Sequence, residues 1–200
     1  MEENPIEEIK TLLLKAKAQK QRNNITEAIE LLNQAHEIGI QNNAVEDLVD
    51  IHNQLILLHY LNNDTDRFRK SYNFSRTLAL RINYNRGLVE TFMNIAWIET
   101  DNKNFVEAIT HASEALALDD ILDNAPAFTT ALYIVSEANY HVGDIEKAEK
   151  YKRLYQKQLM KLTEQEEQMI RSIEGLATGI STENDLDARV RQALDELDSF

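Results

Sequence analysis

Cysteine is absent from this chain of 200 residues, which excludes a disulfide framework and the chemistry of thiols and of Cys-ligated zinc. Proline occurs only twice and glycine five times, and this scarcity of helix-breaking residues favours a nearly all-helical protein. No apolar run approaches the length of a membrane span, and the first residues, Met-Glu-Glu-Asn-Pro, lack a basic and apolar signal sequence. We therefore expect a cytoplasmic protein that does not contact a membrane.

The sequence motifs of common catalytic and cofactor sites are also missing. The five histidines include no His-Glu-x-x-His zinc motif, and the scattered glycines form no phosphate-binding loop. Nucleic acid is disfavoured as a partner because the net charge of −13 would repel phosphate groups. These absences predict a protein that is not an enzyme, with no cofactor, no metal site and no catalytic residue.

What the chain does contain is a pattern that repeats every forty residues. Each copy opens with Asn or Asp, which is typical of a helix N-cap, and Ala or Phe follows four residues later. The opening residues are Asn24, Asp64, Asn104 and Asp144, and Glu27 and Glu107 complete a capping-box pattern in two copies. Internal repetition of this length predicts stacked helical hairpins.

The third copy carries the most regular set of large and small apolar residues. They are Phe92, Ile95, Ala96, Phe105, Ala108, Ala115 and Leu118. With these residues the chain resembles the tetratricopeptide-repeat (TPR) family over about residues 9–160. A repeat of forty residues is similar to the long-repeat subclass that includes kinesin light chain and the peptide-sensing regulators of Gram-positive bacteria.

This resemblance implies an all-α fold, a right-handed α-solenoid of about four TPR-like hairpins with an extended C-terminal helix and a short tail helix. The second copy is weaker, because Ile56 and Phe68 replace the usual small residues and its register could slip by one. We expect helices near residues 5–21, 24–39, 44–61, 64–82, 86–101, 104–118, 125–142 and from 144 to about 175. The expected domains are the array (1–162), the end of the last helix with a linker (163–180) and the tail helix (181–200).

The end of the chain offers two surfaces for association. Apolar residues recur in a heptad pattern over residues 159–176, as in the connecting helices of bacterial signalling proteins, so this segment either dimerises or caps the last repeat. Residues 163–200 hold ten acidic and three basic residues. Within them, the amphipathic spacing of Leu186, Val190, Leu194 and Leu197 predicts a tail helix that docks on its own array or on a second copy, or else only keeps the protein soluble.

In TPR-like arrays the first helix of each hairpin lines a concave groove, so the resemblance also implies which residues line it here. They are Leu13, Lys17, Lys20, Asn53, Leu57, Tyr60, Met93, Asn94, Trp97, Tyr133, Glu137 and Tyr140. Aromatic rings with polar tips and side-chain amides are suited to binding an extended peptide. Trp97 and Tyr133 have an equally reasonable alternative, which is packing between hairpins.

We therefore predict a non-enzymatic module that binds a peptide or partner helix of another protein in its groove. The alternative is a sensory or regulatory domain, in which ligand-dependent curvature, or dimerisation through the long C-terminal helix, controls a signalling partner.

Overall fold

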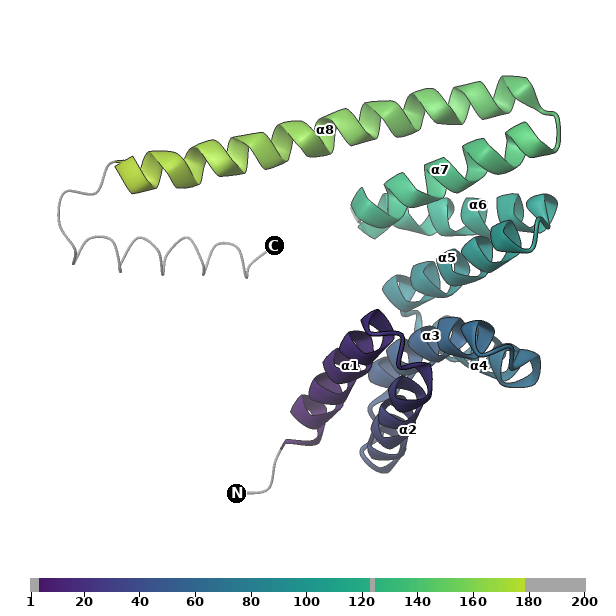
Figure 1. Ribbon diagram of the computed structural model, residues 1–200, viewed down its shortest axis with the longest axis vertical. Coiled ribbons are helices and arrows are strands. Elements are labelled where there is room, and N and C mark those ends of the chain that lie inside the picture. The colour runs from purple at the N-terminus through teal and green to yellow at the C-terminus, as the bar shows by residue number, and fades with distance from the viewer. Residues whose placement is uncertain (1–3, 123–124, 179–200) are drawn as a thin grey trace. The chain divides into compact units, whose positions relative to one another are not determined.

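The computed structural model describes the backbone of residues 4–122 and 125–178, and the side chains of residues 4–118 and 126–169. Eight helices follow one another along these residues, without a strand among them (Figure 1). They are α1 (Pro5–Gln21), α2 (Ile25–Gln41), α3 (Val45–Leu61), α4 (Thr65–Ile82), α5 (Asn85–Asp101), α6 (Phe105–Leu122), α7 (Ala125–His141) and α8 (Ile145–Thr178). The predicted all-α class is confirmed.

The chain divides into two compact units, residues 1–155 and residues 156–200. The first unit contains α1 to α7 and the start of α8, and the second contains the rest of α8. None of the described helices is both long and apolar enough to cross a membrane. Within the described residues, no group of three or more His, Asp or Glu side chains is arranged to hold a metal ion.

From α1 to α7, each helix packs against the next along the chain, and α3 and α5, and α5 and α7, also touch. Small side chains make this close packing possible between α5, α6 and α7, where Ala96, Ala108, Ala112 and Ala138 are fully buried. Phe105 lies partly buried against the same cluster. The pairing of small and large residues in the third sequence copy therefore forms a real core between three helices.

The described turns between helices are spaced by twenty residues or by twice that number, and twenty is half the period of the sequence pattern. Left-handed backbone angles occur at Asn23, Asn43, Asn63, Asn83, Lys103 and Gly143. In each turn the next residue donates its backbone N–H to a carbonyl five residues earlier, as Asn24 does to Gln19 at 2.9 Å. Asparagine and glycine tolerate this conformation. The turns within a hairpin and the turns between hairpins therefore close with the same backbone geometry.

The helix cap expected at Asn24 is not formed. Asn24 makes no side-chain hydrogen bond to its own helix, and its amide instead donates to Gln19 Oε1 at 3.0 Å. By contrast, Asp64 Oδ1 accepts from Arg67 N at 3.0 Å, and Asp144 Oδ1 accepts from Lys147 N at 3.2 Å. The capping box predicted with Glu27 was therefore wrong, because the Asn24 amide bridges back across the turn.

A buried polar network joins α3, α4 and α5. Asn53 Nδ2 donates to Gly87 O at 2.9 Å, while Asn53 Oδ1 accepts from the hydroxyls of Ser75 and Thr91, each at 2.8 Å. All three polar side chains are fully buried. Asn94 Nδ2 adds a bond to the backbone oxygen of Asn53 at 2.9 Å. These hydrogen bonds attach the second hairpin to the third, in addition to the apolar contacts that Val49 and Ile56 make with α5.

Candidate binding surface

Three neighbouring pockets surround the C-terminal ends of α3 and α5. The first, of about 650 Å³, lies between the ends of α3, α4 and α5 and is lined by Tyr60, Thr65, Phe68, Arg69, Glu99 and Asp101, among others. The second, of about 560 Å³, lies between α5 and α7 and is lined by Trp97, Asp101, Lys103, Phe105, Tyr133, Glu137 and His141, among others. The third, of about 440 Å³, is lined by Lys20, Leu57, Leu61, Asn94 and Trp97. We call them the α3–α5, α5–α7 and α1–α5 pockets.

The three pockets share walls. Asp101 lines both the α3–α5 and the α5–α7 pocket, and Trp97 lines both the α5–α7 and the α1–α5 pocket. Leu61 lines the α3–α5 and α1–α5 pockets. A single ligand that crosses this region can therefore place side chains in adjacent pockets.

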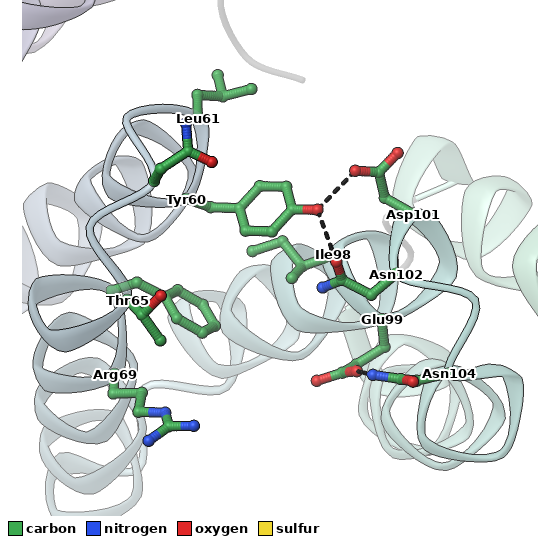
Figure 2. Close-up of a pocket in the computed structure, with 11 residues that line it drawn as sticks. Tyr60, Leu61, Thr65, Arg69, Ile98, Glu99, Asp101, Asn102 and Asn104 are labelled. Atoms are coloured by element: carbon green, nitrogen blue, oxygen red, sulfur yellow. Dashed lines mark hydrogen bonds between the residues drawn. The ribbon is translucent and has the colours of Figure 1, made fainter.

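A strong hydrogen bond fixes the wall between two of the pockets. Tyr60 Oη donates to Asp101 Oδ2 at 2.6 Å, across the gap from α3 to α5, and lies 3.1 Å from Asn102 Oδ1 (Figure 2). This bond to the carboxylate, with a smaller contribution from burial, raises the pKa of Tyr60 to about 12. The phenol therefore stays protonated at physiological pH and keeps the Asp101 carboxylate at the edge of the α3–α5 pocket.

One wall of the α3–α5 pocket is formed by a residue with a short side chain, Thr65. Thr65 stands where the other repeats have Ile25, Phe105 and Ile145, and it lines the pocket from an exposed position. Across the pocket, Asn104 Nδ2 donates to Glu99 Oε2 at 2.7 Å (Figure 2). The irregular second copy of the sequence pattern therefore coincides with this concave feature.

Exposed aromatic rings mark the other two pockets. Trp97 is 45% exposed and meets Tyr60 edge-to-face, with ring centroids 6.0 Å apart. Tyr133 is 49% exposed, and its ring centroid lies 5.7 Å from that of Tyr155, in the part of α8 that belongs to the first unit. Large aromatic side chains with free area beside concave pockets are typical of protein-binding surfaces.

The structure brings most of the predicted groove residues to this region. Lys20, Leu57, Asn94 and Trp97 line the α1–α5 pocket; Trp97, Tyr133 and Glu137 line the α5–α7 pocket; Tyr60 lines the α3–α5 pocket. The remaining accessible ones line none of these three pockets. Among them, Leu13 and Met93 are half-buried against the core, whereas Lys17 and Tyr140 are exposed.

Asn53 is a correction to that prediction. Its side chain has no exposed area, and the amide donates to Gly87 O and accepts from the hydroxyls of Ser75 and Thr91. No ligand can reach it in this fold, so Asn53 is a packing residue and not a groove residue. The side chains predicted for tail docking, Leu186, Val190, Leu194 and Leu197, lie outside the described residues.

Several residues of the surface were not singled out from the sequence. Thr65, Phe68 and Asp101 line the α3–α5 pocket, and Lys103 and His141 line the α5–α7 pocket. Thr65 and Phe68 carried a signal, because both break the pattern set by the other three copies. Asp101 carried none, since one exposed carboxylate at a helix end is ordinary in a chain with 34 acidic residues.

Comparison with known proteins gives a fold and no family. No protein-family model and no curated protein matches the sequence. Among solved structures, the chain is similar to the crystal structure of BtubC (BKLC) from P. vanneervenii, with a TM-score of 0.68 at 15% sequence identity. The match covers 81% of this chain and 67% of the other. At that identity the likeness shows a shared fold alone.

Proposed function

We propose that residues 1–162 form a right-handed α-solenoid of TPR type that binds a peptide or a partner helix of another protein, without catalysis. The observation that carries this proposal is the position of Trp97, which is almost half exposed where two pockets meet. A large aromatic side chain held at that exposure loses hydrophobic stabilisation that burial would supply. A partner that covers the ring recovers this contribution as binding energy.

The surroundings of Trp97 support a peptide ligand. Tyr60 and Tyr133 present further aromatic area, and the side-chain amide of Asn94 lines the adjacent pocket. Aromatic anchors combined with groups that can hydrogen-bond a peptide backbone are typical of surfaces that bind extended segments. The three pockets differ in charge and size, which suits a sequence-selective ligand.

A second candidate is a sensory or regulatory domain that acts through a second copy of the chain. It is favoured by two exposed apolar side chains at heptad positions in the second unit's part of α8, Leu159 and Met169, which are 44% and 49% exposed. Such side chains at helical spacing are typical of helix association. Sedimentation of the full chain distinguishes this role, since Leu159→Glu with Met169→Glu should convert a dimer to a monomer.

The leading proposal is tested with peptides selected by the full chain from a phage-displayed library of random segments. A selected peptide, made synthetically with a fluorescent label, is then titrated and its anisotropy is measured. Trp97→Ala should weaken binding by about 2 kcal/mol, or roughly thirtyfold, as expected for an anchor aromatic. The intrinsic fluorescence of Trp97, the only tryptophan of the chain, should also shift when the unlabelled peptide binds to the wild type.

Leu14→Ala is the matched control, because Leu14 is 69% exposed on α1 and lines none of the three pockets. It should leave the affinity within a factor of two of the wild type, about 0.4 kcal/mol. Equal losses in both variants, or unfolding of Trp97→Ala in circular dichroism, would contradict a direct role of the Trp97 ring.

A further inference from the structure

The α5–α7 pocket combines aromatic rings with carboxylates. Trp97 and Tyr133 contribute exposed rings, and Asp101 and Glu137 contribute the acidic groups. The two aromatic residues lie on different helices, α5 and α7, as do the two acidic ones. A ligand group placed in this pocket therefore meets both kinds of side chain from both helices.

Among the described residues, no Lys, Arg or His side chain forms an ion pair with Asp101 or Glu137. The ion pairs formed within the described residues involve other acidic side chains, and none includes Asp101 or Glu137. Asp101 Oδ2 accepts from Tyr60, whereas its Oδ1 accepts no hydrogen bond from the side chains that the structure describes. Lys103 is the single Lys or Arg that lines this pocket, and it lies more than 4 Å from any described carboxylate.

The aromatic rings favour the same sign of ligand charge. The faces of aromatic rings carry negative potential, and cations bind over them, most strongly over tryptophan. The guanidinium of arginine combines this stacking with charge-assisted hydrogen bonds to a carboxylate, and Asp101 can accept one at Oδ1 while Oδ2 keeps its bond from Tyr60. In the α3–α5 and α5–α7 pockets together, three carboxylates (Glu99, Asp101, Glu137) face two lysine or arginine side chains (Arg69, Lys103).

We propose that the α5–α7 pocket binds an arginine or lysine side chain of a partner peptide, with its stem against Trp97 and its charge at Asp101 and Glu137. The inference rests on the proposed peptide-binding function and names the ligand class. The neighbouring α1–α5 pocket, lined by Leu57, Leu61 and Trp97, takes an apolar residue of the same segment. The preferred ligand is therefore an extended peptide in which a basic and an apolar residue lie close in sequence.

The test begins with selection of random peptides by the full chain at pH 8. Arginine and lysine should be enriched over aspartate and glutamate in the selected sequences. One selected peptide is then made in two forms, with its arginine and with citrulline, which keeps the shape but not the charge. The citrulline form should bind about tenfold more weakly, as expected for loss of a charge-assisted contact.

Protein variants locate the effect. Asp101→Asn with Glu137→Gln should weaken binding of the arginine peptide about tenfold and leave the citrulline peptide nearly unchanged. Glu30→Gln with Glu37→Gln removes the same charge from exposed positions on α2 and serves as the matched control. The control should change both affinities by less than a factor of two, or about 0.4 kcal/mol.

The outcomes separate the two levels of the proposal. If the selected peptides are acidic or neutral, Trp97→Ala weakens their binding roughly thirtyfold and the Asp101 and Glu137 variant binds them normally, the basic-ligand inference is wrong and the peptide-binding function stands. If no peptide is selected, or binding does not depend on Trp97, both are overturned.

Discussion

The contact region between two successive hairpins, here called a seam, is polar at one place in the first unit and apolar at the equivalent place forty residues later. The seam at α3, α4 and α5 holds Asn53, Ser75, Gly87 and Thr91 in a hydrogen-bonded network. Forty residues later, the seam at α5, α6 and α7 has Met93, Ala115, Ala127 and Ala131 at the corresponding positions. Ala115 and Ala131 are fully buried, as are Ser75 and Thr91. The backbone arrangement therefore accepts either a satisfied polar network or apolar packing at one seam.

The two solutions differ in what they tolerate. An apolar seam loses stability in proportion to the contacts removed, and its small residues can be exchanged with modest cost. A polar seam is stable only while every member is satisfied, because each buried group left without a partner costs its full desolvation. The polar seam should thus be the more sensitive of the two, and it also opposes a one-residue slip of α3 that would separate Asn53 from its partners.

The largest expected effect is at Asn53. Asn53→Ala leaves buried oxygens of Ser75, Thr91 and Gly87 with fewer partners and opens a cavity, and should lower the free energy of unfolding by about 4 kcal/mol. Met93→Ala at the apolar seam should cost about 2 kcal/mol, since Met93 is only half-buried. Urea unfolding followed by circular dichroism measures both.

A transplant between the seams sharpens this prediction. Asn53→Met with Ser75→Ala and Thr91→Ala places the third-hairpin residues in the second hairpin and removes the polar groups together. The triple variant should be more stable than Asn53→Ala alone, since no buried polar side chain is left unpaired. A triple variant that is less stable than the single one would show that the network contributes more than the satisfaction of its own members.

The next effect is steric. A Cβ at Gly87 would collide with the ring of Tyr84 and lie 2.6 Å from Val49 Cγ1, so Gly87→Ala should cost about 3 kcal/mol. The corresponding residue of the apolar seam is Ala127, which already carries a Cβ. Ala127→Gly should cost only about 1 kcal/mol, by loss of helix propensity. Equal costs at the two positions would contradict the closer approach at the polar seam.

A smaller effect depends on pH. Asp50 lies next to the polar seam, where Tyr84 Oη donates to its Oδ2 at 3.2 Å. Burial raises the pKa of Asp50 to about 6, against the opposing effects of Tyr84 and Arg86, and nearby Glu46 and Asp47 raise it slightly further. The folded state therefore binds more protons than the unfolded state between pH 4 and pH 6, and stability falls as pH rises through this window.

Asp50→Asn removes that titration while keeping an acceptor for Tyr84. As pH rises from 4 to 7, the free energy of unfolding of the variant should increase by about 1 to 2 kcal/mol relative to that of wild type, allowing for partial exposure of the carboxyl. His52 titrates in an overlapping range with the opposite sign, because burial lowers its pKa to about 4. Subtracting the free energy of unfolding of wild type from that of Asp50→Asn at each pH removes the His52 contribution, because both proteins contain His52. If this difference does not change with pH, Asp50 is not the group that makes stability depend on pH.

The smallest effect concerns the turns. Asn63 and Lys103 occupy equivalent turns of the second and third hairpins, with φ of 56° and 63°. Asparagine tolerates this left-handed conformation better than lysine. Lys103→Asn should therefore raise the free energy of unfolding by about 0.5 to 1 kcal/mol, and Asn63→Lys should lower it by a similar amount. Thermal unfolding followed by circular dichroism should show the corresponding small shifts of the midpoint temperature.

Local signals in the sequence predicted most of the helices. The expected 5–21, 64–82 and 125–142 agree with Pro5–Gln21, Thr65–Ile82 and Ala125–His141 to within a residue, because Asn, Asp and Pro at helix starts act through neighbouring backbone groups. The end of α6 was placed at 118 and lies at Leu122. No Gly or Pro ends that helix at 118, and the sequence there continues with residues that are compatible with a helix.

The site was less predictable because it depends on distant partners. Asn53 looked like a surface amide, but its hydrogen-bond partners lie 22, 34 and 38 residues away in sequence. The α3–α5 pocket likewise requires the ends of three helices to meet around a short Thr65. Trp97 and Tyr133 both line the α5–α7 pocket, and their role in a binding groove stays a prediction.

The twenty-residue spacing of the left-handed turns also defines the smallest interchangeable piece of the chain. Since the connection after α1 closes like the one after α2, a single helix with its turn can be removed without creating a new kind of loop. Removal of twenty residues would exchange the first and second helices of every later hairpin, whereas removal of forty would leave each helix in its original place within a hairpin. Versions of this chain that are shortened or lengthened should therefore keep the order of first and second helices only when the change is made in steps of two helices.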